Sequence, residues 1–474
     1  MKACDLLNTT SEIEITNITN NSREIEPGGL YFALKGLTVD GHNYIDSAIE
    51  NGAVAIVHTS DVSKQDGILY IQVEDMNVAY NQISSKFWGY PTNSLKVIGT
   101  TGTNGKSTTS WILDDILNSV YNSGYIGTIG IKTDNILRSS PFTTLLPHQY
   151  NQIFAQMVES GKDYATIEVS SQGLDQHRTD FIEFDYAIMT NLTHDHLDYH
   201  KTMENYLTAK AILFTSLKAD GIAVINNDDD ASSDYLKSVT TGKIVTYGID
   251  TESDVWAKDV KLLADSSEFT LSYFGQEYPI VTNLVGKFNV YNLLAAIAVA
   301  IDCGITIEQL QSTVQKLSQV AGRMEIVEND QDLNIIVDYA HTPDGFTQVY
   351  NYVKAITTGK VISVFGAAGE RDFVKRPTLG KIGSEASDYI ILTEEDCLGE
   401  DPYKIAMEVA TGIEDTPYEY IQDREEAIAK AFSMAEAGDS VVMLSKGQEE
   451  FQKRAEGKVP YPGDINVAKA QLNK

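Results

Sequence analysis

The chain has 474 residues, about three times a typical domain of ~150 residues, so we expect three domains that each bury their own core. It carries 36 Lys and Arg against 67 Asp and Glu, and the net charge of −31 repels phosphate backbones, so no nucleic-acid partner is expected. The longest apolar run, Leu293 to Ile301, is about half of the ~20 residues that a membrane-spanning helix needs, so no membrane association is expected.

The cysteines and the N-terminal stretch favour a cytoplasmic protein. Cys4, Cys303 and Cys397 are scattered and lack the spacing of metal ligands, which is typical of a reducing compartment. The stretch MKACDLLNTTSE lacks the apolar segment of a secretory signal.

Hydrophobic patterning predicts α/β structure throughout. Short β-rich runs alternate with helix from Tyr31 to Ile71, and the turn-rich WGYPTNS (Trp88 to Ser94) is a domain boundary. Strand candidates then recur between helical or loop segments, which predicts a parallel sheet with crossover helices; they are Lys96 to Thr100, Tyr164 to Val169, Tyr186 to Asn191 and Ile222 to Ile225. A helix at Asn289 to Asp302 closes this region, and a second boundary falls near Val320 to Arg323.

The last third of the chain repeats the α/β signal. Its apolar strands end in polar or glycine residues, and such ends hold ligands in open α/β sheets; they are LNIIVDY, KVISVFG, YIILT and SVVMLSKG. We therefore predict three domains: a small N-terminal α/β domain (1–93), a central P-loop-type domain with a parallel sheet (94–321), and a C-terminal Rossmann-like α/β domain (322–474).

The segment VIGTTGTNGKSTTSWILDDIL, Val97 to Leu117, predicts a phosphate-binding loop. A strand runs into a glycine-containing loop, then Lys106 and Ser107, then a helix. Backbone N–H groups and the helix N-terminus favour phosphate there, Lys106 can reach the terminal phosphates, and Ser107 can ligate Mg²⁺. The strict pattern has glycine where this chain has Thr100, so a plain glycine turn is the alternative.

Two segments supply candidate metal ligands. Glu168 ends the run YATIEV, where a carboxylate can face the loop; an N-cap or a surface acid is the alternative. The segment TNLTHDHLDYH holds three of the eight histidines, and His196 is its best candidate ligand, unless the loop is merely solvated. Because no cysteine accompanies the histidines, Mg²⁺ or Mn²⁺ is favoured over zinc.

These motifs together resemble the Mur ligases, which use ATP to add amino acids to the peptidoglycan precursor. The resemblance covers nearly the whole chain, and its motifs follow in the family's order: NSREIEPGGLYFALKG with DGH, TGTNGKST, EVSSQGLDQHR, TNLTHDHLDYH, YLTAKAILF, GKFNVYN, GRMEIV, DYAHTPD, FGAAGERDFVKRP and SKGQEEFQ. The last three most resemble the MurE type, which adds the third residue of the stem peptide. The resemblance implies that ATP phosphorylates an acceptor carboxylate, that an amine attacks the acyl phosphate, and that Mg²⁺ and cations stabilise the developing charge.

The resemblance also implies roles for individual residues. The expected ATP contacts are Thr103, Asn104, Gly105, Lys106, Ser107, Thr108, Asn289, Asn292, Arg323 and Asp338. The expected catalytic residues are Lys106, Glu168, His196 and Lys210, and the expected metal ligands are Ser107, Glu168, His196 and Lys210 as a carbamate. Without the family, Lys210 would be interpreted as an exposed helical lysine and Arg323 as a surface charge.

For the acceptor, the resemblance implies contacts to the uridine nucleotide and to the muramoyl peptide. These are Ser22, Arg23 and His42, and then Thr143, Thr144, Ser170, Gln176 and Arg178. Leu145 stands where the family has proline, and Gln172 where it has histidine. These two departures weaken the prediction of the peptide contacts but leave the prediction of the fold unchanged.

The identity of the amino acid that is added is predicted from a position at which this chain departs from the family pattern. Ligases of meso-diaminopimelate carry a DNPR motif whose arginine holds the extra carboxylate, and this chain has Glu395, Asp396, Cys397 and Leu398 there. With Glu394, Glu400 and Glu449 nearby, an acidic pocket without its arginine favours a side-chain ammonium. The expected amino-acid contacts are Arg371, Glu395, Asp396, Leu398 and Glu449. The alternative is that the acidic run is solvated surface.

The resulting expectation is a monomeric cytoplasmic ligase. It would use ATP and Mg²⁺ to join L-lysine to the D-glutamate of UDP-MurNAc-L-Ala-D-Glu; the alternatives are L-ornithine or meso-diaminopimelate in the same reaction. A P-loop regulatory NTPase would not need the motifs of the last third, and a metal-dependent phosphohydrolase would act without ATP. A folylpolyglutamate-type enzyme begins at the phosphate loop and would lack the N-terminal motif.

Overall fold

The computed structural model describes residues 1–36, 39–134 and 136–473. The chain divides into two compact units. The first comprises Met1–Gly99, Tyr121–Ala187 and Ile212–Gly221, and the second comprises Thr100–Val120, Ile188–Ala211 and Ile222–Lys474. The domain limits 93/94 and 321/322 stay a prediction.

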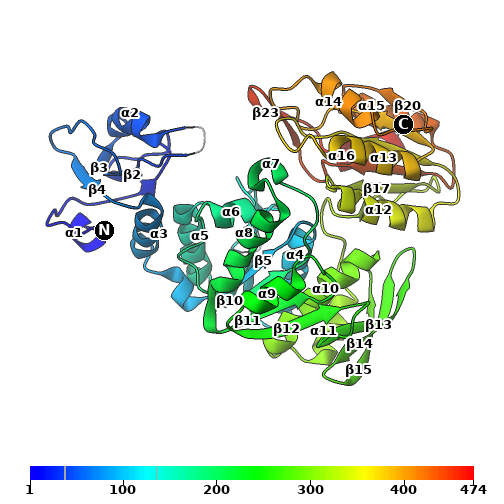
Figure 1. The fold of residues 1–474 in the computed structure, drawn as a ribbon, viewed down its shortest axis with the longest axis horizontal. Helices are drawn as coiled ribbons and strands as arrows, with labels where there is room; N and C mark the ends of the chain where they lie inside the picture. Colours follow the sequence, from blue (N-terminus) through cyan, green and yellow to red (C-terminus); the bar gives the residue numbers. More distant parts are fainter. Residues whose placement is uncertain (37–38, 135, 474) are drawn as a thin grey trace. The chain divides into compact units, whose positions relative to one another are not determined.

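The N-terminal part is a four-stranded parallel sheet with a helix on each face (Figure 1). Its strands are β1 (Ile18–Thr19), β2 (Gly29–Phe32), β3 (Ala53–His58) and β4 (Leu69–Gln72); its helices are α1 (Ala3–Leu6), η1 (Gly41–Tyr44), α2 (Ile45–Glu50), α3 (Met76–Phe87) and η2 (Pro91–Ser94). Leu30 and Phe32 share a core with α3, whereas Tyr31 and Ala33 share one with α2. Because side chains alternate along a strand, β2 buries both of its faces.

The central sheet has eleven strands in the order β15-β14-β13-β12-β11-β10-β5-β9-β6-β7-β8. They are β5 (Lys96–Thr101), β6 (Ser123–Ile126), β7 (Ile131–Lys132), β8 (Leu137–Arg138), β9 (Tyr164–Glu168), β10 (Phe184–Met189), β11 (Leu217–Asn226), β12 (Lys243–Gly248), β13 (Val255–Leu262), β14 (Ser267–Tyr273) and β15 (Gln276–Thr282). The helices that follow them are α4 (Lys106–Leu117), α5 (Pro147–Glu159), α6 (Ser171–Asp175), α7 (Leu197–His200), α8 (Met203–Thr215), α9 (Ser233–Val239), α10 (Lys287–Asp302) and α11 (Ile307–Val314). The strands and the helix predicted here are confirmed to within a few residues.

One part of this sheet was not predicted. Strands β13, β14 and β15 pair antiparallel and form one edge of the sheet. Burial alternates over the first half of β13, over most of β14 and at the end of β15, so one face is solvated and carries polar side chains. This polarity is why the segment gave no clear signal in the sequence.

The C-terminal sheet has the order β16-β17-β21-β18-β19-β20 and is parallel except for β16. Its strands are β16 (Glu325–Ile326), β17 (Asn334–Asp338), β18 (Val361–Phe365), β19 (Tyr389–Leu392), β20 (Tyr418–Tyr420) and β21 (Ser440–Leu444), followed by the hairpin β22 (Phe451–Arg454) and β23 (Gly457–Pro460). One core contains side chains of α12 (Pro343–Ile356), α13 (Arg376–Ala386) and α14 (Pro402–Ala410), and the other contains those of α15 (Arg424–Met434) and α16 (Asp464–Leu472). Helices on both faces confirm the predicted α/β class.

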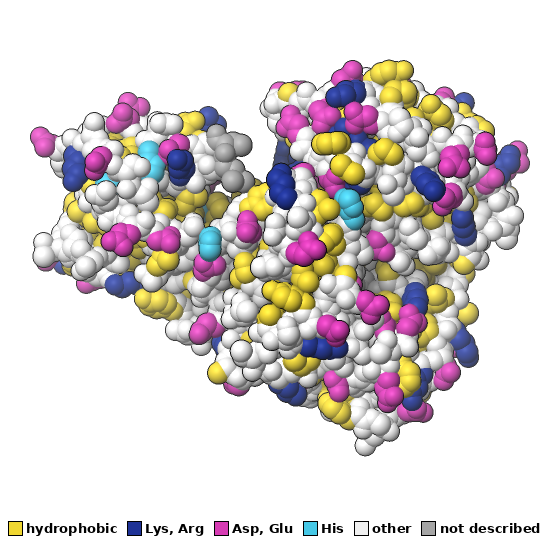
Figure 2. Space-filling model, viewed as in Figure 1, with side chains coloured by type: hydrophobic (Ala, Val, Ile, Leu, Met, Phe, Trp, Pro, Cys, Tyr) yellow, Lys and Arg dark blue, Asp and Glu magenta, His cyan; other side chains and the backbone are white. Residues whose placement is uncertain are grey.

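The surface charge and the helices relate to two expectations from the sequence, that the protein has no nucleic-acid partner and no membrane association. Acidic side chains are dispersed over the face drawn in Figure 2, and Lys and Arg lie among them rather than in one basic stripe. No helix among residues 1–36, 39–134 and 136–473 is both long and apolar enough to span a membrane.

A buried ion pair joins two helices of the C-terminal sheet to the end of β21. The Arg424 guanidinium donates to both carboxylate oxygens of Asp464, at 2.7 and 2.6 Å, and to the carbonyl of Leu444 at 2.8 Å. Both charged side chains are fully buried. Removing one partner would leave a buried charge without compensation.

We therefore expect Asp464→Ala to lower the free energy of unfolding by about 3–5 kcal/mol. Urea unfolding followed by circular dichroism measures the change. Glu385→Ala is the control, because its pair with Lys381 is exposed and should contribute less than about 1 kcal/mol. Equal effects of the two substitutions would contradict the prediction.

Candidate active site

The phosphate loop lies between β5 and α4, and its two glycines are required by close packing. Gly102 has φ 150°, and a Cβ there would lie 1.7 Å from Oγ1 of Thr190. Gly105 has φ 86°, and a Cβ there would lie 2.4 Å from Oδ1 of Asn292. Thr100 lies inside β5 and is fully buried, so the missing glycine of the strict pattern falls in a strand, where no glycine is needed.

The Lys106 side chain folds back over this loop. Its Nζ donates to the carbonyls of Gly102 and Thr103, both at 2.9 Å. Lys106 is also the first residue of α4, whose N-terminus favours an anion. Ser107 and Thr108 follow in the first turn and are buried. The loop thus has the backbone, the cation and the helix end that a phosphate group needs.

Side chains from distant parts of the second unit hold the loop. Asn104 donates from its backbone N–H to Oδ1 of Asn191 at 3.0 Å, and from its side chain to Oδ2 of Asp344 at 2.7 Å. The Thr342 hydroxyl donates to Oδ1 of Asn104 at 3.1 Å. Thr103 exchanges hydrogen bonds with the backbone of Thr193. The segment DYAHTPD therefore contacts the phosphate loop directly.

The expected ATP contacts of the second unit lie at or near this loop, with one exception. Arg323 donates to Oγ of Ser107 at 3.1 Å and stacks 4.3 Å from the Tyr339 ring, so it is not merely a surface charge. Asn292 accepts from the Thr109 hydroxyl of α4 and donates to Asn289. Asn289 in turn donates to the carbonyl of Val285.

Asp338 is the exception, because its carboxylate is used by the backbone. It is buried at the end of β17 and accepts from the N–H groups of Met324 and Ala340, both at 2.6 Å. Burial raises its pKa above the usual value of an aspartate. In this structure Asp338 fastens the segment after Arg323 to the strand, and a ribose contact stays a prediction.

Lys210 and His196 lie beside the loop, and burial disfavours the charged form of both side chains. Lys210 is buried, and its Nζ donates to the carbonyl of Gly102 at 2.8 Å, so the interpretation as an exposed helical lysine is wrong. Burial, and then the nearby Lys106, hold the pKa of Lys210 well below its usual value. Burial lowers the pKa of His196 to about 3, so its ring is neutral and able to bind a metal.

Glu168 belongs to the first unit and is held by several donors. It is fully buried, which excludes both an exposed surface acid and a solvated N-cap. The Tyr125 hydroxyl donates to its Oε1, the Thr128 N–H donates to Oε1 at 2.8 Å, and the Thr128 hydroxyl donates to Oε2 at 3.2 Å. The carboxylate therefore has a fixed orientation.

The candidate metal ligands among the described residues are of different chemical types, and they do not form a cluster of His, Cys, Asp and Glu side chains. In the part of the chain that the structure describes, no group of three or more His, Cys, Asp and Glu side chains is placed to hold a metal. The Ser107 hydroxyl, the neutral His196 ring and the buried Lys210 are nevertheless suitable groups around a phosphate loop. A Mg²⁺ ion there fits donors supplied largely by phosphate oxygens.

An unpredicted ion-pair cluster lies beside His196. Lys375 donates to Oδ1 of Asp195 at 3.0 Å, and both side chains are almost fully buried. His341 lies 3.8 Å from Asp195, and His194 lies 3.0 Å from Asp372. The motifs THDHLD, DYAHTPD and GERDFVKRP contain these residues, but nothing in the linear sequence pairs them.

The expected muramoyl-peptide contacts form one network in the first unit. Thr144 donates to Oγ of Ser170 at 3.0 Å and accepts from its N–H at 2.9 Å. Arg178 donates to the carbonyl of Thr144 and to the side chain of Gln176, at 2.8 and 2.7 Å. Thr143 bonds to Thr128, one of the donors to Glu168. The structure thus connects these expected contacts to the candidate metal ligand.

The expected uridine-nucleotide contacts lie in the N-terminal sheet. The ring of His42 lies 2.7 Å from Oδ1 of Asp40, and its other nitrogen accepts from the N–H groups of Thr59 and Ser60. Ser22 is buried, whereas Arg23 is exposed. His42 therefore ties two loops together, and its contact with a nucleotide stays a prediction.

The acidic run at the end of β19 is compensated by cations, which corrects the expectation of an acidic pocket without a partner. Arg454 binds both oxygens of Glu394, at 2.7 and 3.2 Å. Lys446 and Lys453 lie 2.8 and 3.0 Å from Asp396. These cations come from the end of β21 and from β22, 50 to 60 residues later, so local charge counting missed them.

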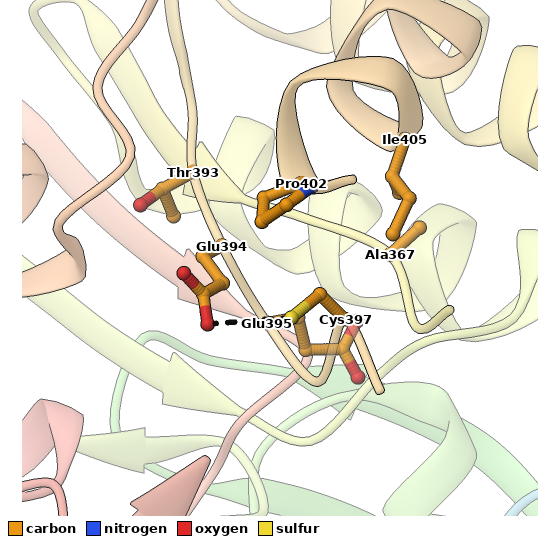
Figure 3. Close-up of a pocket in the computed structure, with 7 residues that line it drawn as sticks. All are labelled: Ala367, Thr393, Glu394, Glu395, Cys397, Pro402 and Ile405. Carbon is orange, nitrogen blue, oxygen red and sulfur yellow. Dashed lines mark hydrogen bonds between the residues drawn. The ribbon is translucent and has the colours of Figure 1, made fainter. Parts of the chain in front are cut away.

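The remaining expected amino-acid contacts surround the same acidic run. Glu449 lies 2.6 Å from Lys446, Leu398 follows the run with φ 51°, and Arg371 is exposed in the loop after β18. Figure 3 shows the pocket beside them, lined by Ala367, Thr393, Glu394, Glu395, Cys397, Pro402 and Ile405. Burial, and then Asp396, raise the pKa of Glu395 to about 7.

Family models match three consecutive segments of the chain. They are described as the "Mur ligase family, catalytic domain" at residues 14–88, the "Mur ligase middle domain" at residues 100–300, and the "Mur ligase, glutamate ligase domain" at residues 322–447.

Relatives and solved structures agree with these models. A UDP-N-acetylmuramoyl-L-alanyl-D-glutamate–2,6-diaminopimelate ligase of Clostridium acetobutylicum is 40% identical over 93% of this chain and 91% of its own. The ligase of the same name from Halalkalibacterium halodurans is 38% identical over 96% and 94%. A solved structure of a ligase of that name has a TM-score of 0.68 and 29% identity, covering 98% and 96%. The MurF ligase of Thermotoga maritima in complex with ADP, 20% identical, shares the fold with a TM-score of 0.69 over 97% of each chain.

We expect Lys106→Ala to lower turnover of ATP at least about 100-fold, because the substitution removes the cation that lies over the phosphate loop. The folded structure should persist, since the site lies on a loop and Nζ donates to the carbonyls of Gly102 and Thr103. Release of ADP and circular dichroism measure the two effects. The exposed Lys64→Ala is the matched control, and an active Lys106→Ala variant would refute the assignment of the loop.

Glu395→Gln should change how stability depends on pH. The pKa of Glu395 is raised from 4.5 to about 7, so the folded chain keeps a proton that the unfolded chain releases in this window. The free energy of unfolding of the native chain therefore falls as the pH rises from 4.5 to 7, by a loss on the order of 3 kcal/mol that Gln avoids. Glu395→Gln should thus be more stable relative to the native chain at pH 8 than at pH 5.

Thermal unfolding at the two pH values measures this difference. The exposed Glu414→Gln variant is the control and should differ equally from the native chain at both pH values. A difference for Glu395→Gln that does not change with pH would show that its carboxyl titrates normally.

Proposed function

Because the chain belongs to the Mur ligase family, we propose that it is a MurE-type ligase that uses ATP to join a diamino acid to the D-glutamate of UDP-MurNAc-L-Ala-D-Glu. The observation that carries the proposal is its identity of 38 to 40% with ligases of that reaction over more than nine-tenths of their length. The phosphate loop, with Lys106 over it and Asn104 bonded to Asp344, supports use of ATP.

The proposed reaction has two steps. In both steps the protein stabilises the negative charge that develops and positions the reacting groups. The acceptor carboxylate attacks the γ-phosphate of ATP, ADP leaves, and an acyl phosphate forms. The uncharged amine then attacks the acyl carbon, phosphate leaves, and an amide bond results. In this proposal Lys106, which lies over the loop, and Arg323, which bonds to Ser107, stabilise negative charge on the phosphoryl oxygens, and no protein nucleophile is needed.

The proposed roles of the metal ligands follow from the donor set. Mg²⁺, when bound, would supply positive charge to the phosphate oxygens. Ser107 and the neutral His196 ring are the groups in the second unit that would hold it, and Glu168 offers an oriented carboxylate. Burial holds the pKa of Lys210 well below its usual value and so favours the neutral amine, which is the form that reacts with carbon dioxide to give a carbamate. Its carbamylation is proposed on that ground together with the family resemblance.

The substrate expected from the sequence, L-lysine, is replaced in this proposal by 2,6-diaminopimelate. The relatives from Clostridium acetobutylicum, Halalkalibacterium halodurans and Bacillus cereus are named as 2,6-diaminopimelate ligases. Lys446, Lys453 and Arg454 form ion pairs with the acidic run, so its charge does not favour a side-chain ammonium alone. The substrates UDP-MurNAc-L-Ala-D-Glu and ATP, a cytoplasmic location and a monomeric state complete the proposal.

Phosphate release from ATP and Mg²⁺ tests the proposal, with UDP-MurNAc-L-Ala-D-Glu as acceptor and meso-diaminopimelate, L-lysine or L-ornithine supplied in parallel. We expect release that requires both acceptor and amino acid, is fastest with diaminopimelate, and is accompanied by a tripeptide product in the mass spectrum. Faster release with lysine would overturn the substrate but keep the ligase. Release that needs no amino acid would instead favour a regulatory NTPase.

A further inference from the structure

Three cationic side chains lie next to the acidic residues 394–396. They differ in their burial and in the ion pairs that they form within the protein. Lys446 is fully buried and lies 2.8 Å from Asp396 and 2.6 Å from Glu449. Lys453 lies 3.0 Å from Asp396, and 3.9 Å from Glu449. Arg454 is the third cation, and 38% of its side chain is exposed.

Arg454 lies directly beside the position where the sequence lacks an arginine. Leu398 and Arg454 are partners in an isolated parallel β-bridge, and the Leu398 N–H donates to the carbonyl of Lys453 at 3.0 Å. A guanidinium from β22 is thus brought to the turn at residue 398, 56 residues away along the chain (454 − 398). A cation is therefore present next to Leu398, although residue 398 itself is uncharged.

The geometry of Arg454 leaves part of its guanidinium available to a ligand. Its Nε and Nη2 donate to the two oxygens of Glu394, whose side chain is almost fully buried and lines the pocket in Figure 3. A guanidinium has five N–H donors in a planar fork, so this pair fixes the fork without using all of them. Within residues 1–36, 39–134 and 136–473, Nη1 has no hydrogen-bond partner.

The chemistry of the proposed substrate calls for such a cation. The side chain of 2,6-diaminopimelate ends in an ammonium and a carboxylate on one carbon, whereas that of lysine ends in an ammonium alone. A site for this end needs an anion and a cation close together. Glu395 lines the pocket, is more than nine-tenths buried, and has one oxygen without a partner among the described residues. Glu395 thus contributes a buried oxygen without a partner, and Arg454 contributes a partly exposed guanidinium from β22, which is paired with the turn that follows Glu395.

We propose that Arg454 is the residue that binds the side-chain carboxylate of a 2,6-diamino dicarboxylic acid and so determines specificity for that acid over lysine. Glu394 is the positioning residue that holds the guanidinium, and Leu398 lines the same turn. This inference rests on the proposed ligase function and adds to it the group that distinguishes the two amino acids.

The test measures the KM for meso-diaminopimelate and for L-lysine in the native chain and in Arg454→Gln. We expect the native chain to prefer diaminopimelate and the substitution to raise its KM at least about tenfold, the loss of one charge-assisted hydrogen bond. The KM values for ATP and for the acceptor should stay within about twofold. A merely structural role of Arg454 would change all three KM values or the folded fraction.

Two further variants make the result decisive. Lys458→Gln, on the same hairpin and exposed, should leave the KM for diaminopimelate unchanged. Leu398→Arg introduced into Arg454→Gln should restore a low KM, because the guanidinium would then come from the bridge partner. An unchanged KM in Arg454→Gln, or a native chain that ligates lysine and not diaminopimelate, would overturn this inference while the ligase proposal stands. A native chain that ligates no amino acid would overturn the proposed function itself.

Discussion

The backbone at residues 102–105 passes so close to its neighbours that it constrains the whole phosphate site. Side chains of Thr190 and Asn292 occupy the space that a Cβ at Gly102 or Gly105 would need. The carbonyls of this loop also receive the amines of Lys106 and Lys210. A bulkier residue would therefore clash with Thr190, just after β10, if it replaced Gly102, and with Asn292, in α10, if it replaced Gly105.

The same loop explains why the polar residues of the C-terminal sheet matter to phosphate chemistry. Asn104 bonds to Thr342 and Asp344, and Arg323 bonds to Ser107. Each contact joins a residue of the loop or of α4 to one more than 200 positions later. Because hydrogen bonds are directional, these contacts hold the loop relative to the start of α12 and to the segment before β16.

The sequence predicted those features that depend on neighbours along the chain. The loop, the helix after it and the buried strands follow from local patterns of glycine and apolar residues, and all of them occur. The antiparallel edge β13–β15 was missed because its solvated face is polar. The pairing of Asp195 with Lys375 was missed because no local pattern relates residues 180 positions apart. Burial of Lys210 and Glu168 likewise depends on tertiary packing rather than on their own segments.

The error about the acidic run shows what decides the charge of a binding site. Glu394, Glu395 and Asp396 are consecutive, so the sequence presents them as one anionic patch. In the fold, β21 and β22 bring Lys446, Lys453 and Arg454 against them, and burial keeps Glu395 partly protonated near neutral pH. The field that a ligand meets is the sum over these groups in space. A motif that lacks its arginine therefore excludes a carboxylate only where no other strand supplies the cation.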